Sequence, residues 1–302
     1  MIRFITLTIT AIALVFTVIL SFLTYSVSNE IDKLETGIND AQILNASYYN
    51  DVLSISNDID QKRVEKNDLD KKLSKVRKDE LYKTQPTAFL TFDDGPSAKT
   101  NLILDILKEY DIKATFFIIG MQAEKSGADT IIKRIVEEGH TIGCHSYSHK
   151  YEDIYKSVDA FFADFDKANN IIEAAAGFKP HLFRFPSGTA TALDFCRKYG
   201  GNRSVYDDIV AELDKRGFIV NDWNIDTLDY SPKTGVRNII DNAVEGAQKR
   251  LGTSYVYKSA LILMHDGSDT VAALPDIIKN LKLMGYNFES LNEDSYSYKQ
   301  IQ

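Results

Sequence analysis

Short β-rich runs alternate with helix-length amphipathic stretches from Pro86 onward, and this alternation restricts the fold more than any other feature of the chain. It is typical of α/β proteins, in which crossover helices join parallel strands. Seven such units in about two hundred residues predict one distorted or open (β/α) barrel rather than two domains. The predicted strands are 87–92, 114–119, 141–144, 182–185, 218–225, 260–264 and 287–291, and the predicted helices include 102–110, 130–138, 158–176, 236–250 and 272–284.

Polar and titratable side chains follow the predicted strands at the points where these strands end. In β/α barrels the reacting groups gather at the C-terminal ends of the strands, where the loops converge. The residues expected at this end of the barrel are Asp93, Asp94, His145, His149, Arg184, Ser187, Asp226, Asp229 and His265. His140 and His181 fall at strand beginnings, so we expect both to be structural.

Three of these residues have the composition of a metal site. Asp94 follows the first predicted strand, and His145 and His149 form a His-x-x-x-His pair about fifty residues further on. One carboxylate and two imidazoles suit a single catalytic divalent ion, such as Zn, Co, Mn or Ni, that keeps positions open for water and substrate. Asp93 then remains free to act as a base. Without the histidines, Asp93-Asp94-Gly95 is equally typical of a turn that ends a strand.

The first quarter of the chain differs from the rest, and we predict three regions: an anchor or signal (1–27), a helical spacer (28–85) and a globular domain (86–302). An uncharged apolar stretch of about twenty residues, Phe4 to Leu23, is long enough to span a membrane as a helix. Arg3 is the only charged side chain before it, which favours a cytoplasmic N-terminus and an exported body. A signal peptide cleaved near Ser26-Val27-Ser28 is the alternative to this retained anchor.

The predicted spacer has apolar residues at helical intervals and many charged residues between them. This pattern indicates amphipathic helices with solvated faces. Lys62 and Lys66 occupy the apolar seam, and the polar stretch 45–50 interrupts it, so the sequence supports a sustained coiled coil only weakly. A helical hairpin and a stalk for dimerisation both stay open.

Composition excludes some partners. The net charge of −8 argues against nucleic acid or an acidic lipid surface as the main partner, and a neutral or mixed substrate fits better. The two cysteines, Cys144 and Cys196, do not define a disulfide framework. Cys144 precedes His145 but lies on an apolar strand, so we expect a buried thiol there rather than a metal ligand.

Five motifs of this chain resemble, in order, those of the NodB-homology polysaccharide deacetylases, carbohydrate esterase family 4. The resemblance covers residues 86–292 and does not extend to the N-terminal quarter. It implies a distorted β/α barrel that removes N- or O-linked acetyl groups from sugars with the help of one divalent metal. The motifs are Thr91-Phe92-Asp93-Asp94-Gly95-Pro96, His145-Ser146-Tyr147-Ser148-His149, Arg184-Phe185-Pro186-Ser187-Gly188, Asp226-Thr227-Leu228-Asp229-Tyr230 and Leu263-Met264-His265.

The resemblance also implies a role for each residue that matches a motif. Asp94, His145 and His149 would hold the metal, which polarises the acetyl carbonyl and acidifies water. Asp93 would be the general base. Arg184 would pair with Asp93 and orient it, a task that suits a fixed guanidinium group.

By the same resemblance, His265 would be the general acid that protonates the amine leaving group. Asp229 would hold this imidazole and raise its pKa, so that it stays protonated at the working pH. The backbone N–H of Ser187 would donate to the oxyanion that forms during attack.

The resemblance places apolar and aromatic residues around the acetyl group. Trp223 and Leu263 would line the pocket for its methyl, although core packing explains a lone tryptophan equally well. Tyr230 stands where the family often has Trp, and Phe185 and Ser187 stand where many members have Pro and Tyr. These departures affect the sugar-binding surface and leave every reacting group in place.

The sequence therefore predicts a membrane-anchored, metal-dependent deacetylase that acts outside the cell on N-acetylglucosamine units, with peptidoglycan as the favoured substrate. Chitin or an exopolysaccharide of N-acetylglucosamine is the enzymatic alternative. A catalytically inactive glycan-binding or envelope scaffold protein is the alternative from another class. Oligomerisation through the spacer is left open.

Overall fold

The structure is a computed structural model that describes residues 2–252 and 254–301, with side chains from residue 11 onward. It divides into two compact units, one up to Lys71 and the other from Lys72 onward. The first unit consists of most of helix α1 (Ile2–Thr84). The second unit contains all the strands of the described residues.

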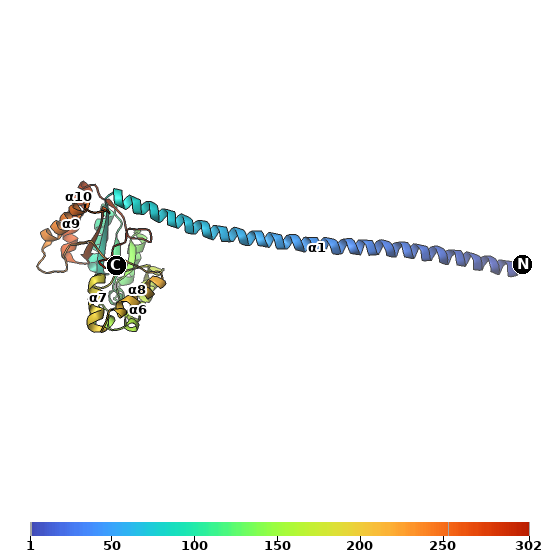
Figure 1. Cartoon of the computed structure of the whole chain (residues 1–302), viewed down its shortest axis with the longest axis horizontal. Coiled ribbons are helices and arrows are strands. Elements are labelled where there is room, and N and C mark those ends of the chain that lie inside the picture. The colour runs from blue at the N-terminus through green and yellow to red at the C-terminus, as the bar shows by residue number, and fades with distance from the viewer. Residues whose placement is uncertain (1, 253, 302) are drawn as a thin grey trace. The chain divides into compact units, whose positions relative to one another are not determined.

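Helix α1 runs without a break, as Figure 1 shows, and the hairpin alternative is therefore wrong. The polar stretch 45–50 interrupts the apolar pattern but contains neither glycine nor proline, so nothing in it ends a helix. Among the described residues, α1 is the one helix long and apolar enough to cross a membrane, with a mean hydropathy of 2.1 in its most apolar window. The predicted apolar helix followed by a helical spacer is confirmed.

The second unit is built on a parallel sheet that curls into an open barrel. In the described part of the chain seven strands follow the order β5-β4-β3-β2-β1-β7-β6, and β8 pairs with β1. The predicted fold class, a distorted (β/α) barrel of about seven strands, is confirmed. The strands are β1 (Thr87–Gly95), β2 (Thr115–Ile118), β3 (Thr141–Cys144), β4 (Leu182–Phe183), β5 (Ile219–Val220), β6 (Ile225–Asp226), β7 (Ser259–His265) and β8 (Asn287–Phe288).

The prediction of a single strand over 218–225 is wrong, because this stretch forms β5 and β6 at opposite edges of the sheet. The four residues between them carry the chain across the gap in the barrel. The N–H of Asn221 still donates to Phe183 on the β4 side, whereas the N–H of Asn224 already donates to Leu261 on β7. The crossing directs the carbonyl groups of Asn221 and Asp222 toward the guanidinium group of Arg184.

The register of β1 with β7 sets the layers inside the barrel. Phe89 pairs with Leu261, Thr91 with Leu263, and Asp93 with His265. Phe89 and Leu261 belong to a buried cluster, while Asp93, Leu263 and His265 line a cavity at the C-terminal ends of the strands. Alternate residues of both strands therefore share one face, as the period of a β-strand requires.

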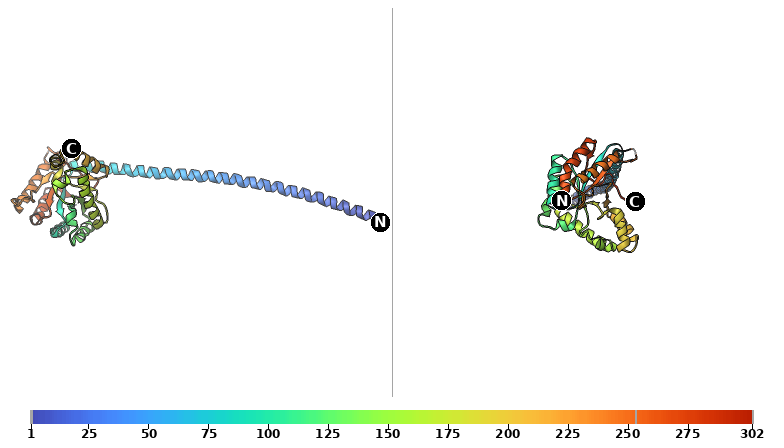
Figure 2. Two further views of the ribbon diagram at one scale, coloured as in Figure 1. Left: turned by 90° about the horizontal axis from the view of Figure 1, so that it is seen from below. Right: turned by 90° about the vertical axis from the view of Figure 1, so that its left-hand side faces the viewer.

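Helices cover the outer face of the curled sheet. Figures 1 and 2 show α9 and α10 side by side on one flank and α6, α7 and α8 together on another. A buried aromatic cluster that includes Phe161, Phe165, Phe183 and Phe185 packs α6 against β4. The helices are α2 (Ala98–Glu109), α3 (Gly120–Ala123), α4 (Ala128–Glu137), α5 (Tyr151–Ile154), α6 (Val158–Ala176), α7 (Gly188–Tyr199), α8 (Ser204–Lys215), α9 (Val236–Leu251) and α10 (Ser268–Leu283).

The last turns of α1 belong to the second unit and help to close the barrel core. Tyr82 is buried against Phe89, with ring centroids 5.6 Å apart, and its hydroxyl donates to Glu289 at 2.8 Å. The hydroxyl of Tyr257 donates to Asp79 at the same distance. Packing of the second unit thus begins before Pro86, in the segment predicted to be a spacer.

Candidate active site

A cavity of about 480 Å³ opens at the C-terminal ends of the strands. It receives side chains from six places in the sequence that are far apart, five of which the strand-end pattern predicted; the sixth is Gln300. Arg184 and Asp229 lie behind its wall and reach it through hydrogen bonds to Asp93 and His265. The lining residues are Asp93, Asp94, His145, His149, Tyr151, Ser187, Thr191, Trp223, Asp226, Tyr230, Leu263, His265 and Gln300.

Asp94, His145 and His149 converge in this cavity. Each offers one ligand atom, and these atoms lie within 4.8 Å of one another. Oδ1 of Asp94 is 3.6 Å from Nε2 of each histidine. This oxygen is buried and has no hydrogen-bond partner among the described residues, so the cluster fits a divalent cation that would complete its coordination.

The imidazole of His145 is presented in a form that can bind a metal. Nδ1 of His145 is 2.8 Å from the carbonyl oxygen of Arg184, and a proton on Nδ1 donated there leaves Nε2 free as a ligand atom. Burial lowers the pKa of His145 to about 3, so the ring is neutral. His149 is only partly buried and stands on the solvent side of the cluster.

The loop between the two histidines has strained backbone and an acidic support. Ser146 and His149 have positive φ values of 72° and 55°, as Asp94 on β1 does at 72°, and such values cost free energy in residues other than glycine. Asp164 on α6 accepts hydrogen bonds from the N–H groups of Tyr147 at 2.6 Å and Ser148 at 2.9 Å. Asp164 thus fixes the His-x-x-x-His loop, a role that its place inside a predicted helix did not reveal.

Asp93 and Arg184 form a buried ion pair beside the cluster. Nη1 of Arg184 is 2.8 Å from Oδ1 of Asp93, and the side chains are 0% and 3% exposed. The guanidinium group also donates to the hydroxyl of Thr91 and to the carbonyl oxygens of Asn221 and Asp222. Burial raises the pKa of Asp93, while the charge and hydrogen bond of Arg184 oppose this rise.

His265 and Asp229 form a second pair across the cavity. Nδ1 of His265 donates to Oδ1 of Asp229 at 2.7 Å, and the backbone N–H of His265 donates to Oδ2 at 2.6 Å. The hydroxyl of Thr270 donates to the same Oδ2. Burial lowers the pKa of His265, but the hydrogen bond and charge of Asp229 outweigh it and raise this pKa to about 9.

Four residues predicted to contact substrate lie on the cavity wall. Trp223 and Leu263 line it together, and Leu263 is buried on β7. Ser187, with a φ of 68°, immediately precedes α7. The Tyr230 side chain is 61% exposed, and its ring meets the ring of His265 edge-on with centroids 5.7 Å apart.

Other residues of the cavity wall were not singled out in the sequence. Tyr151 follows His149 by two residues, and its ring lies 5.2 Å from that imidazole. Thr191 lies in the first turn of α7. Gln300 comes 35 residues after the last motif, at His265, and only the folded chain brings it near.

The remaining histidines and Cys144 take no part in this cavity. His140 is buried, accepts a hydrogen bond on Nδ1 from the N–H of Ala114 at 3.1 Å, and has its pKa lowered to about 4 by burial. Cys144 is buried too, and burial raises the pKa of its thiol to about 12, so it stays protonated. His181 is exposed at the start of β4 and does not line the cavity.

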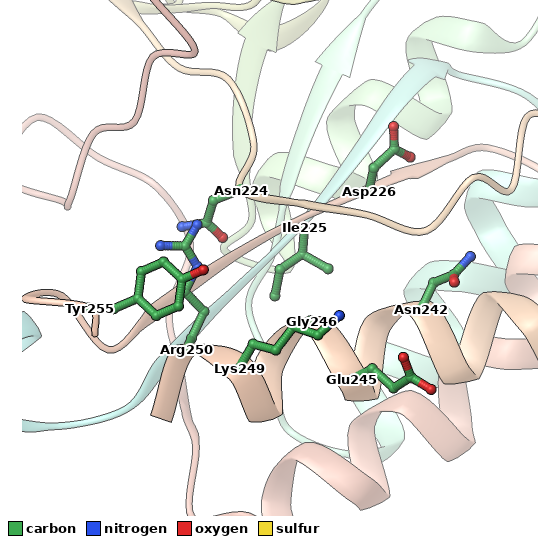
Figure 3. Close-up of a pocket in the computed structure, with 9 residues that line it drawn as sticks. All are labelled: Asn224, Ile225, Asp226, Asn242, Glu245, Gly246, Lys249, Arg250 and Tyr255. Atoms are coloured by element: carbon green, nitrogen blue, oxygen red, sulfur yellow. The ribbon is translucent and has the colours of Figure 1, made fainter. Parts of the chain in front are cut away.

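A smaller cavity of about 280 Å³ lies between β6 and α9. Figure 3 shows Asn242, Glu245 and Lys249 along α9, with Asn224 and Asp226 on the chain above them. Among the described residues its lining contains no histidine or cysteine, so it does not repeat the metal cluster. Asp226 borders both cavities and separates them.

Comparison with known proteins shows which family the chain is similar to. The family model for polysaccharide deacetylase matches residues 81–199. The peptidoglycan-N-acetylglucosamine deacetylase of Bacillus cereus is 34% identical over 233 residues, which cover 74% of this chain and 79% of that protein. The putative polysaccharide deacetylase YheN of Bacillus subtilis is 32% identical over 212 residues, with coverage of 68% and 67%.

A solved structure extends the agreement to the fold. The crystal structure of the catalytic domain of peptidoglycan N-acetylglucosamine deacetylase from Eubacterium rectale superposes with a TM-score of 0.62 at 32% identity. The match covers 71% of this chain and 92% of that one.

The fold and the cavity together define a hydrolase built on an open β/α barrel. The chain belongs to the polysaccharide deacetylase family, carbohydrate esterase family 4. The deacetylases of this family depend on a metal, and the predictions of family and enzyme class are confirmed.

Proposed function

We propose that this protein hydrolyses the N-acetyl group of N-acetylglucosamine units in an extracellular polysaccharide, most directly peptidoglycan. The observation that supports this most is the placement of Asp93 and His265 beside the cluster of Asp94, His145 and His149 in one cavity. Arg184 and Asp229 pair with these two residues from behind the cavity wall. The similarity to the peptidoglycan N-acetylglucosamine deacetylases of Bacillus cereus and Eubacterium rectale supports the choice of substrate.

Asp94, His145 and His149 would hold one divalent metal. When bound, such an ion supplies Lewis acidity toward the acetyl carbonyl and toward water. Zinc is the proposed ion because two imidazoles and a carboxylate suit it, and cobalt, manganese and nickel accept the same ligands. The neutral state of His145 and the free buried oxygen of Asp94 support this assignment.

Asp93 would take the proton from the attacking water. Its position beside His145, with Oδ2 3.6 Å from Nε2, keeps it within the same cavity as the metal ligands. Arg184 binds only Oδ1 of Asp93, which leaves Oδ2 directed toward the cluster. Burial makes Asp93 a stronger base than a solvated carboxylate, since it raises the pKa.

His265 would give a proton to the departing amine. An amide nitrogen cannot leave as an anion, so a group protonated near neutral pH is required on the side of the sugar. Because its pKa is about 9, His265 stays protonated at neutral pH. The N–H of Ser187 would donate to the oxyanion, and Trp223 and Leu263 would enclose the acetyl methyl.

The test is acetate release from purified peptidoglycan, from chitin oligomers and from an N-acetylglucosamine exopolysaccharide. We expect peptidoglycan to be the best substrate, a chelator to abolish release, and Asp93→Asn to lower kcat by about 10²–10⁴-fold. Asp111→Asn, the same change at an exposed aspartate, serves as the control. If wild-type protein with added zinc, cobalt or manganese releases no more acetate than Asp93→Asn from any of them, the proposal fails.

We also propose that residues 1–27 form a retained anchor and that 28–85 are a spacer for a domain outside the cell. The length and apolar composition of the start of α1 support an anchor, and a cleaved signal passes the same test of composition. Membrane extraction and N-terminal sequencing of the mature protein separate the two outcomes.

A further inference from the structure

A segment far from the family motifs, residues 296–301, lies against the gap in the barrel wall. The carbonyl of Tyr298 accepts from the N–H of Asp222 at 2.7 Å, and the hydroxyl of Ser297 donates to the carbonyl of Val220 at 3.3 Å. Val220 and Asp222 lie at the start of the crossing between β5 and β6. The segment therefore covers the opening that these two edge strands leave.

Asp222 fixes the backbone of this segment at Gln300. The Asp222 side chain is fully buried, and its Oδ2 accepts from the N–H of Gln300 at 2.8 Å and from the hydroxyl of Thr189. Oδ1 accepts from the N–H of Thr189 at 3.0 Å, and the N–H of Ile301 donates to the Thr189 hydroxyl at 3.3 Å. A buried carboxylate with several donors is a strong and specific anchor point.

The anchored backbone places the Gln300 side chain on the wall of the active-site cavity. A Cβ added at Gly188 would lie 3.0 Å from Oε1 of Gln300 and 2.9 Å from Cη2 of Trp223. The amide thus sits over Gly188, beside the tryptophan proposed to contact the acetyl methyl. Among the described residues the Gln300 side chain has no hydrogen-bond partner, and the residue is exposed where it lines the cavity.

We propose that Gln300 is a specificity-determining residue whose side-chain amide hydrogen-bonds the sugar that carries the acetyl group. This inference rests on the proposed function and deepens it. A glutamine amide offers both donors and an acceptor, which matches a hydroxyl-rich sugar. The hydrogen bond of the Gln300 backbone to the buried carboxylate of Asp222 fixes the residue on the cavity wall. The contact is to the sugar, so it discriminates glycans and takes no part in breaking the amide bond.

The experiment compares Gln300→Ala with wild type on two substrates. For the N-acetylglucosamine polymer that wild type deacetylates best, KM of Gln300→Ala should rise about three- to tenfold while kcat changes little. The reason is that the lost hydrogen bond would be equally strong in the ground state and the transition state. For 4-nitrophenyl acetate, which has an acetyl group but no sugar, kcat/KM should stay unchanged. Lys299→Ala, at an exposed neighbour outside this cavity, is the matched control and should match wild type on both.

Two results would overturn the assignment. Equal kinetics of Gln300→Ala and wild type on the glycan would show that the amide makes no useful contact. An equal loss on the glycan and on the ester would show a merely structural role. Calorimetry of a β-1,4-linked N-acetylglucosamine tetramer measures its affinity for the protein without turnover. A wild-type protein that releases no acetate refutes the proposed function. An unchanged tetramer affinity in Gln300→Ala refutes this inference, whether or not acetate is released.

Discussion

Replacing Asp229 with asparagine removes the charge that keeps His265 protonated. Both oxygens of Asp229 bond to His265, one to Nδ1 at 2.7 Å and one to the backbone N–H at 2.6 Å. The Asp229 side chain is 1% exposed, so little solvent screens this charge. Because burial by itself lowers the pKa of His265, we expect that pKa to fall from about 9 to the ordinary value of about 6.5 or below.

The size of the effect follows from the protonated fraction. At a pH of about 7.5, an imidazole with a pKa of about 9 is almost fully protonated, whereas one with a pKa of about 6.5 is protonated in roughly one molecule in ten. A reaction that needs protonated His265 loses activity as the pH rises through this pKa. Asp229→Asn should therefore lower kcat/KM at least about tenfold at this pH, with a smaller loss toward pH of about 6.

The assay is the pH dependence of kcat/KM for acetate release, which reports the pKa values of the free enzyme. The descending limb should move to lower pH in Asp229→Asn. Asp269→Asn, at an exposed position in the first turn of α10, is the control and should keep the wild-type profile. A descending limb that stays near pH of about 9 in Asp229→Asn would refute the reasoning, because Asp229 would then not set the pKa of His265.

Three further changes test the supports of the site. Arg184→Met leaves the carboxylate of Asp93 buried without its partner and should lower the free energy of unfolding in urea by roughly 3–5 kcal/mol. A decrease below about 1 kcal/mol would contradict a tight pair. Tyr82→Ala should lower the free energy of unfolding by about 3–5 kcal/mol in the same assay, since the ring fills the barrel core. An unchanged midpoint of urea unfolding would show that the last turns of α1 are dispensable for stability. Asp164→Ala should weaken zinc affinity about 10–100-fold by calorimetry, whereas Asp166→Ala on the same helix should not, and equal affinities would remove Asp164 from the support of the loop.

Much of the site could be predicted because its reacting residues stand next to strand ends. The buried, mostly apolar run of β1 ends at Asp93 and Asp94, and that of β7 ends at His265, so local sequence already places them at one end of the sheet. The register of β1 with β7, which puts Asp93 opposite His265, follows only from the assembled barrel.

The errors and omissions have a common physical origin in long-range contacts. The run 218–225 has the composition of one strand, but its two ends pair with different edges of the barrel, and no local signal reports this. Asp164, Asp222 and Gln300 act through partners between 16 and 78 residues away. Such residues carry no motif of their own, so only their hydrogen bonds in the folded chain identify them.

The proposed chemistry depends most on the cluster of Asp94, His145 and His149. Diffraction from zinc-soaked crystals on both sides of the zinc absorption edge tests this cluster directly. We expect one strong anomalous peak between Oδ1 of Asp94 and Nε2 of the two histidines, absent from His145→Ala crystals treated in the same way. A cavity without an anomalous peak, or a peak that persists at the same place in His145→Ala, would contradict it.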